Sequence, residues 1–170
     1  MELTTLANLA EVVGVLIVIG GFAFAIVQLL HFRRQRQERA AIELARSFET
    51  PEFAHALRMI LSLPAGIRAD ELRARGDDYE DAAMLVSLTL ESVGIMVHRR
   101  IVSFDLVWEL MGGVVLGAWD RIRDWAFAIR RERADDKFDE WIHWLAAQLQ
   151  KYKAQTGSQA AYRQHDKWRP

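Results

Sequence analysis

The stretch that decides the fold of the N-terminal part of this chain is VVGVLIVIGGFAFAIVQLLHF, residues 12–32. It contains no charged residue, and only Gln28 and His31 are polar. A helix rises about 1.5 Å per residue, so this stretch would span about 30 Å, the thickness of the hydrocarbon core of a bilayer. We therefore predict a transmembrane helix over residues 12–32, preceded by a short extracytoplasmic lead at residues 1–11.

Two other interpretations of this stretch are weaker. A cleaved signal peptide begins with basic residues and ends at a small-residue cleavage site. Here Glu2 and Glu11 precede the apolar run, and LLHFRRQR closes it. A core helix that is apolar on every side would need other helices all around it. We expect an uncleaved anchor.

Basic residues follow the apolar run, and none precedes it. All 22 Lys and Arg residues lie after residue 32. Four of them flank the membrane end of the predicted helix: Arg33, Arg34, Arg36 and Arg39. The positive-inside rule then predicts a protein of the bacterial inner (cytoplasmic) membrane, with its N-terminus outside and residues 33–170 in the cytoplasm. The four arginines would also contact anionic membrane lipid.

Small or polar residues recur every seven positions along the predicted anchor. They are Ala7, Gly14, Gly21 and Gln28. Small residues let two helix backbones approach, and a glutamine in lipid gains from a partner across the contact. We interpret them as a helix-packing stripe that joins copies of this chain into a homo-oligomer or joins it to other membrane subunits. The alternative is the ordinary composition of a membrane span.

Composition limits what the rest of the chain can be. Residues 33–170 carry a net charge of only +1 and no nucleic-acid-binding motif, so we expect no nucleic acid as partner. The absence of cysteine excludes disulfides, thiol chemistry and cysteine-ligated metals. Three prolines and few β-branched runs favour helix. We predict an all-α protein in which the transmembrane helix continues into a cytoplasmic helical bundle, with no cofactor.

Capping and breaking residues divide the chain after the anchor. The anchor helix should continue to near Thr50, and the helical domain should cover residues 33–155, followed by a polar, mobile tail at residues 156–170. Within the domain we expect five segments: a helix from Thr50-Pro51 to Leu63-Pro64, a short helix around residues 69–75, a long helix capped by Asp77 or Asp78 and ending near His98, a helix capped by Ser103, and a last helix starting at Asp135 or Asp136.

Two features inside these helices carry further expectations. Gly112-Gly113 should kink its helix or admit a close neighbour. The long helix ending at His98 is apolar around most of its girth, so we place it at the centre of the bundle.

Four segments in order resemble a bacterial family of short, uncharacterised membrane-anchored proteins that carry a domain of unknown function. They are EFAHALRMIL from Glu52, LESVGIMVHRRIVSFDLVWEL from Leu90, AWDRIRDW from Ala118 with Arg130 after it, and FDEWIHWL from Phe138. The resemblance follows an N-terminal span with its arginines and covers most of the chain after residue 12. It implies a helical, membrane-anchored protein and no particular reaction.

Two Glu-x-x-His pairs, Glu52/His55 and Glu140/His143, have the spacing of a helical di-metal site. Both pairs lie off the apolar faces of their predicted helices, so we expect no metal site. The tryptophans should pack in the core. Trp125 and Trp144 would become candidate interface residues if they stayed at the rim.

Glu91 is the candidate buried acid, because it interrupts an apolar helix. A carboxylate in such a place must be paired, hydrogen-bonded or neutral. It could be a proton-active or ligand-contacting acid. The favoured alternative is a structural acid that pairs with an arginine or caps the end of a neighbouring helix.

No catalytic motif emerges from the chain. The leading hypothesis is a non-enzymatic, single-pass membrane protein that is an accessory subunit of a membrane complex or assembles through its transmembrane helix. The second is a membrane-tethered cytoplasmic sensor or regulator, and the third is a small enzyme. A pocket with convergent polar groups would favour the second or third, whereas a solid core with an apolar outer strip would favour the first.

Overall fold

The computed structural model describes residues 14, 17–29, 31–32, 42, 46, 48, 50–157 and 160–169. Within these ranges all regular structure is helical and no strand occurs, which confirms the predicted all-α class. The chain divides into two compact units, Met1–Ala40 and Ala41–Pro170.

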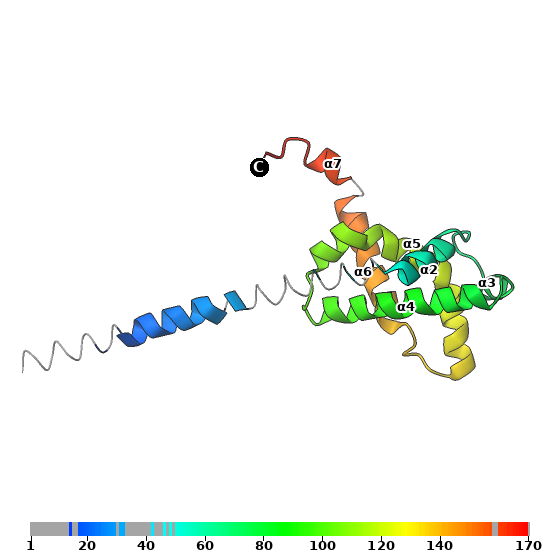
Figure 1. Cartoon of the computed structure of the whole chain (residues 1–170), viewed down its shortest axis with the longest axis horizontal. Coiled ribbons are helices and arrows are strands. Elements are labelled where there is room, and N and C mark those ends of the chain that lie inside the picture. The colour runs from blue at the N-terminus through cyan, green and yellow to red at the C-terminus, as the bar shows by residue number, and fades with distance from the viewer. Residues whose placement is uncertain are drawn as a thin grey trace, which may run out of the picture. The chain divides into compact units, whose positions relative to one another are not determined.

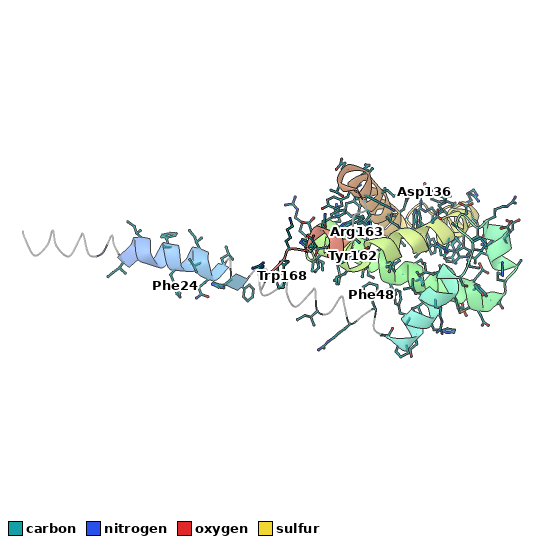
Figure 2. The ribbon with its side chains drawn as sticks, turned by 90° about the horizontal axis from the view of Figure 1, so that it is seen from above. Phe24, Phe48, Asp136, Tyr162, Arg163 and Trp168 are labelled. Atoms are coloured by element: carbon teal, nitrogen blue, oxygen red, sulfur yellow. The ribbon has the colours of Figure 1, made fainter. Side chains whose placement is uncertain are left out.

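The described part of the N-terminal unit is a helix whose continuous stretch is Ile17–Leu29 (Figure 1). Every described side chain of this helix is exposed, and Phe24, labelled in Figure 2, is 65% exposed. Ile17–Leu29 is apolar but shorter than 18 residues. Some residues of the predicted span 12–32 lie outside the described ranges, so its full extent stays a prediction.

Among the described residues, one helix has both the length and the composition to cross a membrane, and it is Asp77–His98. Its most apolar window has a mean hydropathy of 1.3, and 44% of that window is buried inside the structure. Core helices of soluble proteins meet the same criterion, so length and composition alone do not separate the two uses.

Helix α2 (Pro51–Leu61) begins as the sequence predicts. Thr50 is its N-cap, and the Thr50 hydroxyl accepts a hydrogen bond from the Phe53 N–H at 3.3 Å. Pro51 occupies the first turn, where its missing N–H is not needed. The short helix expected around residues 69–75 is α3 (Ala69–Arg73).

Helix α4 (Asp77–His98) has the predicted extent but a different start. Its N-cap is Gly76, with φ of 108°, so the prediction that Asp77 or Asp78 caps it is wrong. The chain turns from α3 into α4 through a positive φ that glycine adopts without strain. Asp77 and Asp78 instead lie in the first turn, where negative charge favours the positive end of the helix dipole.

Helix α5 (Phe104–Arg133) starts at the predicted cap, since the Ser103 hydroxyl accepts the Leu106 N–H at 3.3 Å. The helix is continuous through Gly112-Gly113. A Cβ at Gly112 would lie only 2.8 Å from the Trp108 ring of the same helix, so this glycine makes room for an indole. The sequence left open a kink or a close neighbour, but the group beside Gly112 is an indole of its own helix, and nothing lies within 4 Å of a Cβ built on Gly113.

The last two helices are α6 (Glu140–Thr156) and α7 (Ala161–Gln164). The prediction that the last long helix starts at Asp135 or Asp136 is wrong, because residues 136–139 form a turn first. Asp135 caps that turn by accepting the Lys137 N–H at 2.9 Å. The polar tail predicted from residue 156 contains α7, whose Tyr162 is 72% exposed.

Helix α4 contacts α2, α3, α5 and α6, which confirms its central place in the bundle (Figure 1). Trp125 of α5 is 1% exposed and donates its Nε1–H to Glu80 of α4 at 2.8 Å. Trp125 is therefore a core residue rather than a rim residue. Glu80 also accepts from Arg73 at 3.1 Å, and Arg73 pairs with Glu132 at 2.6 Å, so this network ties α3 and α5 to α4.

Candidate functional site

The start of α6 is held by a carboxylate that comes from α4. Oε2 of Glu91 accepts hydrogen bonds from the backbone N–H groups of Trp141 at 2.9 Å and Ile142 at 2.7 Å. These N–H groups lie in the first turn, where a helix offers no internal acceptor. Asp139, in the N-cap position, makes no side-chain cap of its own. Glu91 therefore caps α6 from another helix.

The backbones of α4 and α6 touch beside this cap. A Cβ added at Gly94 would lie 2.7 Å from the carbonyl carbon of Trp141 and 2.9 Å from its Cβ. Only a residue without a side chain allows this approach. Gly94 lies one turn after Glu91, so the glycine brings the first turn of α6 within reach of the carboxylate.

Asp139 is a buried acid next to Glu91. Asp139 is 3% exposed and has a φ of 57°, and its Oδ2 has no hydrogen-bond partner among the described residues. Burial raises the pKa of Asp139 to about 7, and the negative charge of Glu91 adds to the rise. The Ser87 side chain and the positive charge of Arg130 oppose it. Asp139 therefore exchanges its proton near neutral pH.

Arg130 brings α5 into the same cluster. Its Nε–H donates to the backbone carbonyl of Phe138 at 2.7 Å, and its guanidinium carbon lies 5.2 Å from the ring centroid of Phe127. Its Nη2 is buried and has no partner within the described residues. The guanidinium thus fixes the turn before α6 and keeps one positive charge near two carboxyl groups.

The carboxyl groups of Glu91 and Asp139 can bind a proton, and the cluster also holds α4, α5 and α6 together. Burial also raises the pKa of Glu91, although the N–H groups of Ile142 and Trp141 oppose the rise by stabilising the charged form. The pKa values of Glu91 and Asp139 therefore move in the same direction, as expected for two acids that share one poorly solvated place. The arrangement permits proton uptake at the joint of α4, α5 and α6.

His143 lies one turn into α6, outside the buried part of the cluster. Its ring stacks on Trp119 at 5.2 Å between centroids and an interplanar angle of 21°. Burial, and next the charge of Arg130, lower the pKa of His143. A neutral imidazole stacked on an indole acts here as a packing group.

The sequence identified only part of this cluster. It singled out Glu91, and the geometry gives Glu91 the capping role that was favoured over a proton-active one. It missed Asp139, and it gave Arg130 no role in a buried site. The signal that could have found Asp139 is the pair of acids at residues 139–140 just before an apolar helical face, which is typical of a helix start.

The predicted packing stripe and basic flank lie in the N-terminal unit. Gly14, Gly21 and Gln28 are exposed on its helix, and nothing lies within 4 Å of a Cβ built on Gly14 or Gly21. Ala7 lies outside the described residues. So do the four flanking arginines Arg33, Arg34, Arg36 and Arg39.

The histidines of the two Glu-x-x-His pairs have other partners. His55 accepts a hydrogen bond on Nδ1 from Arg58 at 3.0 Å, and His143 stacks on Trp119. Within the described residues no three His, Asp or Glu side chains are grouped to hold a metal ion.

A separate apolar groove of about 690 Å³ lies between α2 and α5. Its lining residues are Phe48, Phe53, Ala54, Leu57, Arg58, Leu61, Ser62, Leu110, Met111 and Val114. Arg58 is the only charged residue among them, so the groove lacks the convergent polar groups of a typical enzyme site.

Comparison with known proteins gives one family. Residues 15–149 match the family described as a domain of unknown function, DUF4760. No curated protein matches the chain, and no solved structure does. Because the match extends over both compact units and well over half of the sequence, the chain belongs to the DUF4760 family.

Proposed function

We propose that this protein is a non-enzymatic, single-pass membrane protein of the bacterial inner membrane that serves as an accessory or self-assembling subunit. The observation that carries the proposal is the helix Ile17–Leu29. Its large apolar side chains are all at least half exposed, from Val27 at 50% to Ile17 and Phe22 at 69%. A helix with such a surface needs a lipid or protein environment.

The second apolar helix does not compete for the same role. Helix α4 packs against four other helices and carries Glu91, whose carboxylate holds the start of α6. Insertion of α4 into lipid would separate that carboxylate from its two N–H donors, which is costly in a bilayer. This favours Ile17–Leu29 as the anchor and the unit Ala41–Pro170 as a domain in the cytoplasm.

Membrane anchoring is tested with the full chain expressed in bacteria. We expect it to stay with the membrane after an alkaline carbonate wash, and a reporter fused after Pro170 to be active only in the cytoplasm. Replacing Ile19 and Phe24 with arginine should release the protein, since each charge at the centre of a span costs about 3 kcal/mol. A wild-type protein that is washed off, or a reporter active only outside, would refute the anchor or its orientation.

Assembly through the anchor is tested on the predicted stripe. Leucine at both Gly14 and Gly21 should weaken association in mild detergent, because bulk on a packing stripe separates helices. The matched control places leucine at Val15 and Phe22, where the side chain should meet only lipid. Cross-linking yields that are equal in the two variants would show that the stripe is ordinary span composition.

A membrane-tethered sensor is the second candidate, and one observation favours it. Asp139 has a pKa of about 7 at the joint of three helices, so a small change in pH changes the charge of that joint. A sensor requires that protonation also changes the structure. Amide hydrogen exchange of α6 at pH 6 and pH 8 would separate the candidates, since a purely structural cluster should protect α6 equally at both values.

A further inference from the structure

Along the length of helix α4, one face is left uncovered by the described part of the chain. Every third or fourth residue on this face is exposed, and we call the set the outer face of α4: Asp78, Asp81, Leu85, Leu88, Ser92, Ile95 and Arg99. The buried residues of α4, such as Val86, Leu90 and Val93, lie on the opposite side. Spacing that alternates three and four residues is the register of paired helices.

The middle of the outer face is apolar. Leu85 is 38% exposed, Leu88 is 54% exposed and Ile95 is 39% exposed, so three large aliphatic side chains face outward, with Ser92 between Leu88 and Ile95. Exposed large apolar side chains that are grouped on one face and bordered by charge mark an interaction surface.

The two ends of the outer face carry opposite charges. Asp78 and Asp81 lie at its N-terminal end, beside Glu52 of α2 in one groove. Arg99 and Arg100 lie at its C-terminal end. Within the described residues none of these five side chains takes part in an ion pair. The charges are therefore available to a partner that presents the reverse order.

We infer that the outer face of α4 binds the same face of a second copy of this chain in antiparallel orientation. The face is symmetric about residue 90, because three pairs of its positions are equally distant from that residue. An antiparallel pair centred there would place Asp81 opposite Arg99, Leu85 opposite Ile95, and Leu88 opposite Ser92. In each pair one residue is in an a position and the other in a d position, as antiparallel helix packing requires.

The charges favour a second copy over a lipid surface. The acidic end, with Asp78, Asp81 and Glu52, would be repelled by anionic headgroups, whereas the basic end of a second α4 complements it. Antiparallel helices also place the positive end of each helix dipole near the negative end of the other. A twofold pair satisfies both ends at once, because each contact occurs twice.

The inferred contact deepens the proposed function by naming a partner. It rests on the proposed function only in that two chains anchored in one membrane meet at a raised effective concentration. The two proposals fail separately. If the α4 pair does not form, the protein still stays in the membrane fraction. If the anchor is wrong, the protein is missing from the membrane fraction.

The experiment uses cysteine pairs, because the chain has no cysteine of its own. Two differently tagged full-length chains are co-expressed, one with Leu85→Cys and the other with Ile95→Cys, and membranes are treated with a mild oxidant. We expect a disulfide between the two chains. Two Leu85→Cys chains should cross-link at least about tenfold less, since ten residues of offset separate the thiols by about 15 Å along the axis.

A charge exchange tests the ends of the pair. Asp81→Arg or Arg99→Asp alone should lower the Leu85–Ile95 disulfide, and the two together in both chains should restore it. Leu88→Glu should also lower it, whereas Leu110→Glu on α5, with a residue 53% exposed, is the matched control and should not.

Three outcomes would overturn the inference. The first is no disulfide between positions 85 and 95, and the second is as much disulfide between two copies of position 85, which indicates a parallel or random encounter. The third is a Leu88→Cys and Ser92→Cys pair in two chains that does not cross-link, while the cysteine at position 88 is shielded from a water-soluble maleimide in membranes and not in detergent. That result would assign the face to lipid.

Discussion

Replacing Glu91 with leucine should destabilise the helical domain through the start of α6. The carboxylate accepts the N–H groups of Trp141 at 2.9 Å and Ile142 at 2.7 Å, and leucine leaves both without an acceptor. A hydrogen bond to a charged group contributes about 1.5–3 kcal/mol to the free energy of unfolding. Because Glu91 is only half-buried, we expect the loss of its two hydrogen bonds to lower the free energy of unfolding by about 3 kcal/mol. The melting temperature should fall by about 10 °C.

The measurement is a thermal melt of the full chain in mild detergent, followed by tryptophan fluorescence and by amide exchange at the first turn of α6. Glu91→Gln keeps an oxygen acceptor and should lose only about 1 kcal/mol. Glu109→Leu is the matched control, because Glu109 is an exposed acid on α5 with no hydrogen bond to the described residues. A Glu91→Leu protein that melts with the wild type would refute the capping role.

Three further predictions concern the same joint and its surroundings. Asp139 has a raised pKa in the folded state, so its contribution to the free energy of unfolding is complete below pH 3.8 and is lost as the pH rises to about 7. The contribution amounts to at most about 4 kcal/mol. Asp139→Asn should remove this pH dependence from the free energy measured by urea unfolding. Gly94→Ala should cost about 1–3 kcal/mol in the same assay, because its Cβ meets the Trp141 backbone. Trp125→Phe should cost about 2 kcal/mol by removing the donor to Glu80, and Trp125→Ala more, as melts would show. The first prediction would be contradicted by a wild-type free energy of unfolding that does not change with pH. The second and third would be contradicted by a Gly94→Ala or a Trp125→Phe protein that is as stable as the wild type.

Much of the fold follows from local signals that the sequence contains in full. Thr50 and Ser103 cap helices because their hydroxyls reach the N–H three residues on, and this depends on no other part of the chain. The predicted start of α6 was wrong because its cap is not local. The acceptor is Glu91, about 50 residues earlier, so Asp135 and Asp136 were free to form the turn before the helix.

The sequence could predict the candidate site only where a charged residue interrupts an apolar helical segment. Glu91 is such a residue, since a carboxylate in an apolar helix requires a partner. Asp139 and Arg130 lie in charged stretches that look solvent-exposed in the sequence, and only the packing of α6 on α4 and α5 buries the Asp139 side chain and the Nη2 atom of Arg130. Burial of this kind depends on tertiary contacts, and these leave no periodic hydrophobic pattern in the sequence.

Helix α4 is apolar on more sides than a core helix of this bundle needs. Its inner side fills the core with residues such as Leu90 and Val86, and Glu91 at the edge of that side binds the start of α6. The remaining aliphatic residues, Leu85, Leu88 and Ile95, face outward, and they contribute to the hydropathy that lets α4 resemble a membrane span. A span would need no carboxylate cap for another helix and no opposite charges at its two ends. An assembling core helix accounts for both, and this is the argument for proposing Ile17–Leu29 as the membrane anchor and α4 as the partner surface.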